Sequence, residues 1–144
     1  MERLAPAGDT YQAGTLSGNP LATAAGLATL ARLDPHAYDR LAGTTEEIAS
    51  GLATRAEAAG VPVQVPNVCG LLTVFFSPVP VRDYDGARVA DGAAFARFHA
   101  AMLERGVYLP PSPYEAWFPS LAHGPDEVGA TLEAAAEAFE EVAR

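Results

Sequence analysis

Apolar residues recur every three or four positions in four stretches of the chain, and this spacing predicts four helices. The first helix has a typical start at Asn19-Pro20, where the asparagine caps and the proline occupies the first turn. Gly60 and Gly106 mark the ends of the second and third helices. The predicted helices cover 20–33, 35–59, 92–105 and the residues from His123-Gly124-Pro125 onwards.

The spacing changes to that of strands after the second helix. Residues 71–76, LLTVFF, are apolar on both faces, so this strand is expected to be central in its sheet. Loops rich in proline, glycine and aspartate separate the strands from the later helices. The pattern predicts an α+β fold, in which a small antiparallel sheet of three to four strands is covered by helices. The expected strands are 61–65, 71–76, 107–109 and a segment from about 118 to 121.

Composition and charge narrow the classes of protein that fit. The chain has 144 residues, of which 49% are hydrophobic and 19% charged, as in a globular protein. A net charge of −9 argues against binding to nucleic acid or to an anionic membrane surface. Cys69 is the single cysteine, no apolar run approaches a membrane span, and the N-terminus does not resemble a signal peptide. A cytoplasmic protein is therefore expected.

The chain contains no lysine. All nine basic side chains are arginines. A chain without lysine cannot form a lysine Schiff base, which excludes one large class of covalent catalysis within these 144 residues.

The first candidate site is the turn YQAGTLSGNP at residues 11–20, directly before the first helix. Gly14, Thr15 and Ser17 offer backbone N–H groups and hydroxyls near the positive end of the helix dipole, a typical arrangement for holding an anion such as phosphate. A simpler interpretation is that Asn19 and Pro20 only build a well-made helix start. On this stretch alone the simpler interpretation is favoured, and both stay open.

The second candidate site is the loop PPSPYEAWF at residues 110–118. Here Glu115 lies among Tyr114, Trp117 and Phe118, with prolines that stiffen the backbone, so its carboxylate is a candidate for a role near a substrate. The alternative is that Trp117 and Phe118 close the sheet while Glu115 points to water. The sequence of this loop alone favours that alternative.

Other reactive residues do not form recognisable clusters. His36, His99 and His123 are far apart and have no partners at the spacing of metal ligands, so no metal site is expected. His99 is expected to be at the surface or half-buried, and His123 to hydrogen-bond the backbone at a helix start. Cys69 is interpreted as a core or edge thiol rather than a nucleophile.

Two stretches resemble a known family. Residues 11–26, YQAGTLSGNPLATAAG, are similar to the segment that follows the catalytic lysine in glutamate-1-semialdehyde 2,1-aminomutases. Residues 104–128 resemble the C-terminal segment of the same family, with its pattern GVYLxPSxxEAxFxSxAH. The order of elements between them also fits, so the resemblance covers nearly the whole chain. The second motif is the more specific, because the wider class-III aminotransferase family has a related Gly-Asn-Pro turn.

The resemblance implies a function for the longer protein. The family consists of pyridoxal-phosphate (PLP) enzymes of fold type I, which convert glutamate-1-semialdehyde to 5-aminolevulinate for tetrapyrrole synthesis and act on this small molecule as homodimers. Residues 1–34 would be the phosphate-binding turn and connecting helix of the large domain, and 35–144 the C-terminal small domain. The family's lysine lies upstream of the first motif, so the chain alone is expected to be inactive and not to retain PLP.

The resemblance carries over to few residues. Gly14 and Thr15 match residues that reach the cofactor phosphate of the neighbouring subunit, and Glu115 matches an acidic residue at the edge of the active site. Two positions depart from the family: Trp117 stands where a small residue is expected, and Cys69 where glycine is common. Both departures put the local packing near the site in doubt.

Two other functions stay open. The chain could be part of another class-III aminotransferase that acts on ω-amino acids, but many of these place an arginine near Glu115. No arginine lies between Arg105 and Arg144, which favours the aminomutase. The second alternative is a binding or dimerisation module that kept the small-domain fold without catalysis.

Overall fold

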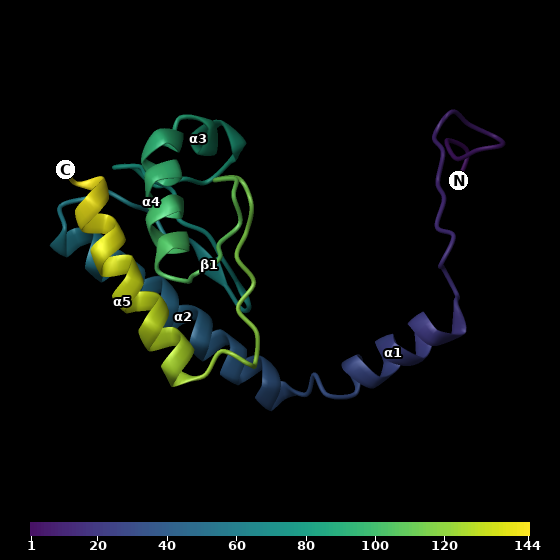
Figure 1. Cartoon of the computed structure of the whole chain (residues 1–144). Helices are drawn as coiled ribbons and strands as arrows, with labels where there is room; N and C mark the ends of the chain where they lie inside the picture. The colour runs from purple at the N-terminus through teal and green to yellow at the C-terminus, as the bar shows by residue number, and fades with distance from the viewer. The chain divides into compact units, whose positions relative to one another are not determined.

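The computed structural model describes all 144 residues, which form two units, Met1–Asp34 and Pro35–Arg144. The assignment of the first unit to a large domain stays a prediction. The first unit contains one helix and the second contains the sheet and the other helices (Figure 1). The elements are α1 (Pro20–Leu30), α2 (Pro35–Ala58), β1 (Asn67–Val68), β2 (Leu71–Leu72), α3 (Tyr84–Arg88), α4 (Gly92–Glu104) and α5 (Pro125–Val142).

The four predicted helices are present, and local chemistry sets their ends. The Asp91 side chain caps α4 by accepting hydrogen bonds from the Ala93 and Ala94 N–H groups, each at 2.9 Å. Gly60 and Gly106 follow α2 and α4 with φ angles of 71° and 80°, a region that favours glycine. Helix α1 ends at Leu30, three residues earlier than predicted, and α2 is continuous.

The sheet is smaller than predicted. Only β1 and β2 form a ladder, with Asn67 opposite Leu72 and Val68 opposite Leu71. Isolated bridges join Gln64 to Phe75 and Leu72 to Trp117. The expectation of three to four strands is therefore corrected to two strands and two single bridges. Prolines explain part of the difference, because they lack the N–H that a ladder needs. Pro62 and Pro119 lie within two of the expected strands, and Pro66 and Pro110 directly follow two of them.

The second predicted strand is nevertheless central. Leu72 pairs with Asn67 on one side and exchanges two backbone hydrogen bonds with Trp117 on the other, at 2.7 and 3.2 Å. Leu72 and Val74 are fully buried. Segments 107–109 and 118–121 are not strands; the pairing falls on Trp117 instead. Helix α3 was not predicted.

The core of the second unit lies where α4 and α5 pack together and α5 packs on α2 (Figure 1). Phe98 stacks on Phe139 with ring centroids 4.6 Å apart, and both rings contact Phe76 at 5.6 and 6.0 Å. Helix α5 buries one stripe of residues, while Leu103 on α4 is 48% exposed, because it lies about 100° around the helix from the buried Met102. The buried stripe of α5 includes Val128, Leu132, Ala135 and Phe139.

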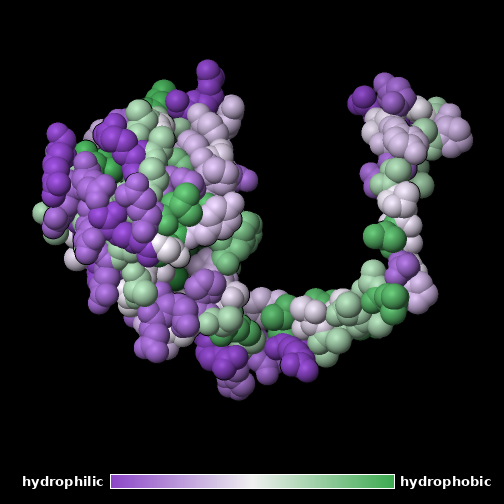
Figure 2. Space-filling view, in the orientation of Figure 1, coloured by the Kyte–Doolittle hydropathy of each residue, from purple (hydrophilic) through white to green (hydrophobic).

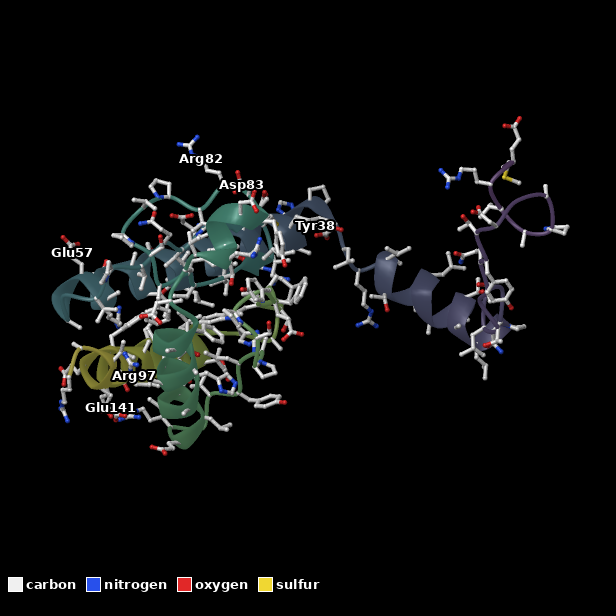
Figure 3. The ribbon with its side chains drawn as sticks, turned by 90° about the horizontal axis from the view of Figure 1, so that it is seen from above. Tyr38, Glu57, Arg82, Asp83, Arg97 and Glu141 are labelled. Carbon is white, nitrogen blue, oxygen red and sulfur yellow. The ribbon has the colours of Figure 1, made fainter.

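An ion-pair cluster ties the end of α4 to α5. The Arg105 guanidinium donates to Glu137 at 2.8 Å, to the Ala101 carbonyl at 2.8 Å, and to Glu141, labelled on α5 in Figure 3. The hydrogen bonds to Glu137 and then Glu141 raise the pKa of Arg105 above its ordinary value. Arg105 therefore stays charged throughout the working pH range and holds the two helices together.

Thr45 fixes the β1–β2 hairpin to α2. Its buried hydroxyl donates to the Leu41 carbonyl at 2.6 Å and accepts from the Gly70 N–H at 3.0 Å. Gly70 has a φ of 76°, and a Cβ there would lie 2.8 Å from Leu41. One hydroxyl thus satisfies the backbone of a turn whose positive φ strongly favours glycine.

We expect Thr45→Val to lower the free energy of unfolding by about 1–2 kcal/mol, because the half-buried Gly70 N–H loses its acceptor. Urea titration followed by circular dichroism measures the loss. Thr54→Val is the matched control, since the Thr54 hydroxyl only bonds the Ser50 carbonyl on the exposed side of the same helix. Equal losses in the two variants would contradict the role of Thr45.

Helix α1 has no polar side to turn toward water. Residues 20–30 contain no charged side chain, and none of them is buried within the first unit. In Figure 2, green and pale atoms cover most of this helix. Leu21, Leu27 and Leu30 are 83%, 65% and 65% exposed. A helix that is apolar on all sides normally packs against other protein.

We therefore expect the isolated chain to self-associate through α1, with an average mass by light scattering that rises with concentration. Leu27→Asp should reduce this rise, because it places a charge on the apolar helix. Leu103→Asp makes the same change at a half-exposed position of α4 and should leave the rise intact. A monomer at every concentration would overturn the expectation.

None of the helices is both long enough and apolar enough to cross a bilayer.

Candidate functional site

The turn before α1 is built from backbone hydrogen bonds within residues 14–19. The Gly14 carbonyl accepts from the Ser17 N–H, and the Leu16 carbonyl accepts from the Asn19 N–H, both at 3.0 Å. Gly18 has a φ of 77°. A Cβ on Gly14 would lie 2.4 Å from the Ser17 hydroxyl, so a larger residue there would require this exposed side chain to rotate away. The turn is thus a defined structure that presents the exposed side chain of Thr15.

The start of α1 is already capped. Asn19 Oδ1 accepts from the Leu21 and Ala22 N–H groups at 3.0 and 3.1 Å, and Pro20 has no N–H. The N-cap interpretation of Asn19-Pro20 is therefore confirmed. The free N–H groups of the helix start are used up, so an anion has to be held by the turn that precedes it.

The donors that remain free are on the turn itself. The hydroxyl and N–H of Thr15, together with the N–H groups of Leu16 and Gly18, have no hydrogen-bond partner in the chain. Consecutive N–H groups and a hydroxyl are a suitable donor set for phosphate oxygens. This set fits the phosphate of PLP. No residue fits its aldehyde, because the chain has no lysine.

Glu115 lies on the surface in a turn of its own. Its carboxylate accepts from the Ser112 N–H at 3.2 Å, and its N–H donates to the Ser112 carbonyl at 3.1 Å. Its carbonyl accepts from the Thr73 hydroxyl at 3.3 Å, which anchors the loop to the sheet. One carboxylate oxygen therefore remains free for a ligand, and the side chain is solvent-exposed.

The aromatic residues around Glu115 differ in their burial and in their contacts. Trp117 is 6% exposed and pairs with Leu72, so it does close the sheet. Phe118 is 70% exposed, so the expectation that it also closes the sheet is wrong. Tyr114 contacts Tyr84 of α3 with ring centroids 6.1 Å apart, which joins two loops that the sequence analysis treated separately.

The histidines and the cysteine have structural contacts. His99 is half-buried and its Nε2 lies 3.1 Å from the Leu109 carbonyl, while His123 Nδ1 accepts from the Ser120 N–H at 3.0 Å. These arrangements match their predicted interpretations. Cys69 is exposed, and its thiol lies 3.4 Å from the Tyr38 carbonyl. No three histidine, cysteine or acidic side chains gather as a metal site would require.

An open pocket beside residues 107–119 has no counterpart in any sequence motif. It has a volume of about 180 Å³ and is lined by residues that are far apart in the sequence, including Leu72, Leu109, Trp117, His123 and Thr131. No local signal marks it, because it forms only where α2, β2, α5 and two loops meet.

Comparison with known proteins shows which enzymes the chain resembles. The chain is 52% identical to the glutamate-1-semialdehyde 2,1-aminomutase of Anaeromyxobacter sp. (strain Fw109-5) over 144 residues, which is 100% of this chain and 34% of the relative. The chain is homologous to one third of a glutamate-1-semialdehyde 2,1-aminomutase. The aligned part is the C-terminal part of those relatives. The resemblance drawn from the two motifs is thereby confirmed. The chain spans about a third of the length of the curated relatives that it matches.

Solved structures agree on the fold. An omega-transaminase from Sphaerobacter thermophilus matches 92% of this aminomutase homologue with a TM-score of 0.76 and 27% identity, over 30% of its own chain. A transaminase with PLP bound matches 96% of the homologue and 31% of its own chain, with a TM-score of 0.75 and 22% identity, a likeness of fold alone. No known protein-family profile matches the chain. The roles of Gly14, Thr15 and Glu115 in this homologue stay predictions.

Proposed function

We propose that this chain is the C-terminal part of a PLP-dependent glutamate-1-semialdehyde 2,1-aminomutase, which converts glutamate-1-semialdehyde to 5-aminolevulinate in tetrapyrrole synthesis. The observation that carries the proposal is the 52% identity to such an enzyme over the whole chain. The fold likeness to transaminases supports the same class of chemistry.

In this proposal the turn at Gly14 and Thr15 binds the cofactor's phosphate. The Thr15 hydroxyl and the neighbouring free N–H groups donate to phosphate oxygens, and the Gly14 carbonyl closes the turn by accepting from the Ser17 N–H. These donors carry no formal charge and are exposed, so they position the phosphate and other parts of the enzyme complete its neutralisation. When bound, PLP supplies the electron sink for amine exchange.

Glu115 is proposed to lie near the substrate. Its free carboxylate oxygen accepts a hydrogen bond from an amino group, while the Ser112 N–H holds the other oxygen in place. The Schiff-base lysine comes from outside this chain, which has none. The chain alone is therefore inactive and retains no covalently bound cofactor.

The complete enzyme is proposed to be a cytoplasmic homodimer that acts on a small-molecule substrate, with the Gly14–Thr15 turn serving the phosphate of the neighbouring subunit. This placement rests on the resemblance of residues 11–26 to the family segment. It accounts for a turn whose donors have no partner within their own chain.

A second candidate is an ω-aminotransferase, favoured by the match to the omega-transaminase structure. Its identity of 27% is about half of that to the aminomutase. The two functions differ in one respect that can be measured: an aminotransferase needs an external amino donor, whereas the aminomutase exchanges amines within its substrate.

A chimera tests the proposal. The C-terminal 34% of the Anaeromyxobacter enzyme is replaced by this chain, so that the upstream part supplies the lysine. We expect 5-aminolevulinate to form from glutamate-1-semialdehyde without an added donor. Activity only with an added amino donor would support the aminotransferase, and a folded, PLP-loaded chimera without either activity would support a non-catalytic module. The chain alone serves as the control and should give no Schiff-base absorbance with PLP.

A further inference from the structure

A second pocket, which we call the Arg97 pocket, lies where the end of α5 meets the first half of α4 and the segment that follows α2. Its volume is about 330 Å³. Val61, Phe76 and Ala94 line it and are themselves buried, so they form an apolar base. An apolar ring of about six carbon atoms fits this space, since a smaller cavity holds benzene. The other apolar residues of the lining are Pro62, Pro78, Val142 and Ala143.

The only cation in the lining is Arg97, which extends from α4 toward α5 in Figure 3. The ion pairs of the chain belong to Arg88 and Arg105, and the Arg97 side chain makes neither an ion pair nor a hydrogen bond. Arg55, which lines a smaller pocket, differs in that it donates to the Gly51 carbonyl. A guanidinium has five N–H donors and no acceptor, so a carboxylate matches both its charge and its forked geometry.

The lining also includes one carboxylate, that of Asp91, which is engaged at the start of α4. Its Oδ1 accepts from the Ala93 and Ala94 N–H groups, each at 2.9 Å, and the positive end of the helix dipole offsets part of its charge. Asp91 forms no ion pair with Arg97. The guanidinium therefore remains an uncompensated positive charge beside the apolar base of the pocket.

The exposure of Arg97 determines how a ligand can lie in the pocket. A ligand carboxylate beside the solvent-exposed guanidinium keeps part of its hydration, while an attached apolar body displaces water from Val61 and Phe76. This arrangement avoids the large loss of hydration that a fully buried charge suffers. An exposed ion pair contributes little binding energy, so we expect a dissociation constant of about 1 mM.

We propose that the Arg97 pocket binds a small monocarboxylate with an apolar body, whose carboxylate pairs with the Arg97 guanidinium while the body packs on Val61 and Phe76. None of Gly14, Thr15 and Glu115 lines the pocket, so binding here does not depend on the proposed function.

The test titrates the full chain with two probes of the same shape. These are cyclohexanecarboxylate and cyclohexanecarboxamide, in which a neutral amide replaces the charged group. The methyl signals of Val61, Ala94 and Val142 are followed in a ¹H–¹³C correlation spectrum at low ionic strength. We expect both probes to shift these signals and the carboxylate to bind about three- to fivefold more tightly, because only the carboxylate forms an ion pair. Added salt should reduce this preference.

Variants assign the preference to one side chain. Arg97→Gln removes the charge and should bind the two probes equally. Arg82→Gln is the matched control and should keep the preference, because Arg82 is also exposed and without an ion pair but extends away from the protein in Figure 3. Asp91→Asn keeps a side chain that caps a helix and removes a repelling charge, so it should strengthen carboxylate binding about twofold.

Three results would overturn the proposal. In the first, neither probe shifts the methyl signals of Val61, Ala94 and Val142. In the second, the unmodified chain binds the carboxylate and the amide with equal affinity. In the third, the preference for the carboxylate is the same in Arg97→Gln as in Arg82→Gln, which would mean that the guanidinium of Arg97 does not hold the ligand.

Discussion

Replacement of Phe98 by alanine is expected to lower the free energy of unfolding by about 3–5 kcal/mol, the usual loss for a fully buried phenylalanine. Phe98 is 0% exposed and lies at the centre of the aromatic cluster with Phe76 and Phe139. Its removal leaves a cavity and also breaks two ring contacts. Because small domains are stable by about 5–15 kcal/mol, the loss takes a large share of the total.

Urea titration followed by circular dichroism measures this loss as a lower midpoint with an unchanged slope. Phe118→Ala is the matched control: the same atoms are removed at a position that is 70% exposed, so its effect should stay within about 0.5 kcal/mol. A loss below about 1.5 kcal/mol for Phe98→Ala would mean that the cluster is not the centre of the core.

Thr15→Val in the chimeric enzyme is expected to raise the dissociation constant for PLP about 10- to 100-fold, the effect of losing one hydrogen bond to a charged group. Valine has nearly the same shape as threonine, and the Thr15 side chain has no other contact that needs its hydroxyl. Equilibrium dialysis against PLP measures the constant.

Thr23→Val is the control for Thr15→Val. The Thr23 hydroxyl donates to the Asn19 carbonyl at 2.9 Å inside α1 and is not available to a phosphate. Loss of the Thr23 hydroxyl should change the dissociation constant for PLP less than threefold. If the two variants bind PLP equally well, the turn does not hold the phosphate. The proposed aminomutase function would not be affected by that result, because it rests on the activity of the unmodified chimera without an added amino donor.

The sequence predicts the helices well because their limits depend on neighbouring residues. Asn19, Gly60 and Gly106 each act within one turn of the chain, and each has the predicted role. Helix α3 was missed because it has only five residues and no apolar stripe to mark it.

The sheet was harder to predict because its pairing is distant in sequence. Leu72 and Trp117 are 45 positions apart, and no local pattern indicates that they exchange hydrogen bonds. Alternating apolar residues suggested longer strands, but the prolines removed the donors that the ladder required. The burial of Leu72 and Val74 was nevertheless evident from the run LLTVFF.

The candidate sites likewise divide into those that the sequence indicates and one that only the tertiary structure shows. Residue chemistry marked Gly14, Thr15 and Glu115 as candidates but favoured a simpler interpretation of each stretch, and only the family motifs favoured a functional role. The pocket beside Trp117 has no motif and depends on tertiary packing of α2, β2, α5 and two loops. At the first site, the free donors lie on the turn, because the N–H groups of the helix start are occupied by Asn19.

The burial of Trp117 has a practical consequence for spectroscopy of this chain. It is the only tryptophan and lies wholly within residues 35–144. Intrinsic fluorescence excited at the indole band will therefore follow the melting of that part alone and will not detect fraying of residues 1–34. If circular dichroism and tryptophan fluorescence give different melting curves, the first explanation is that the tryptophan reports on residues 35–144 only. Such a difference is not by itself evidence for an unfolding intermediate.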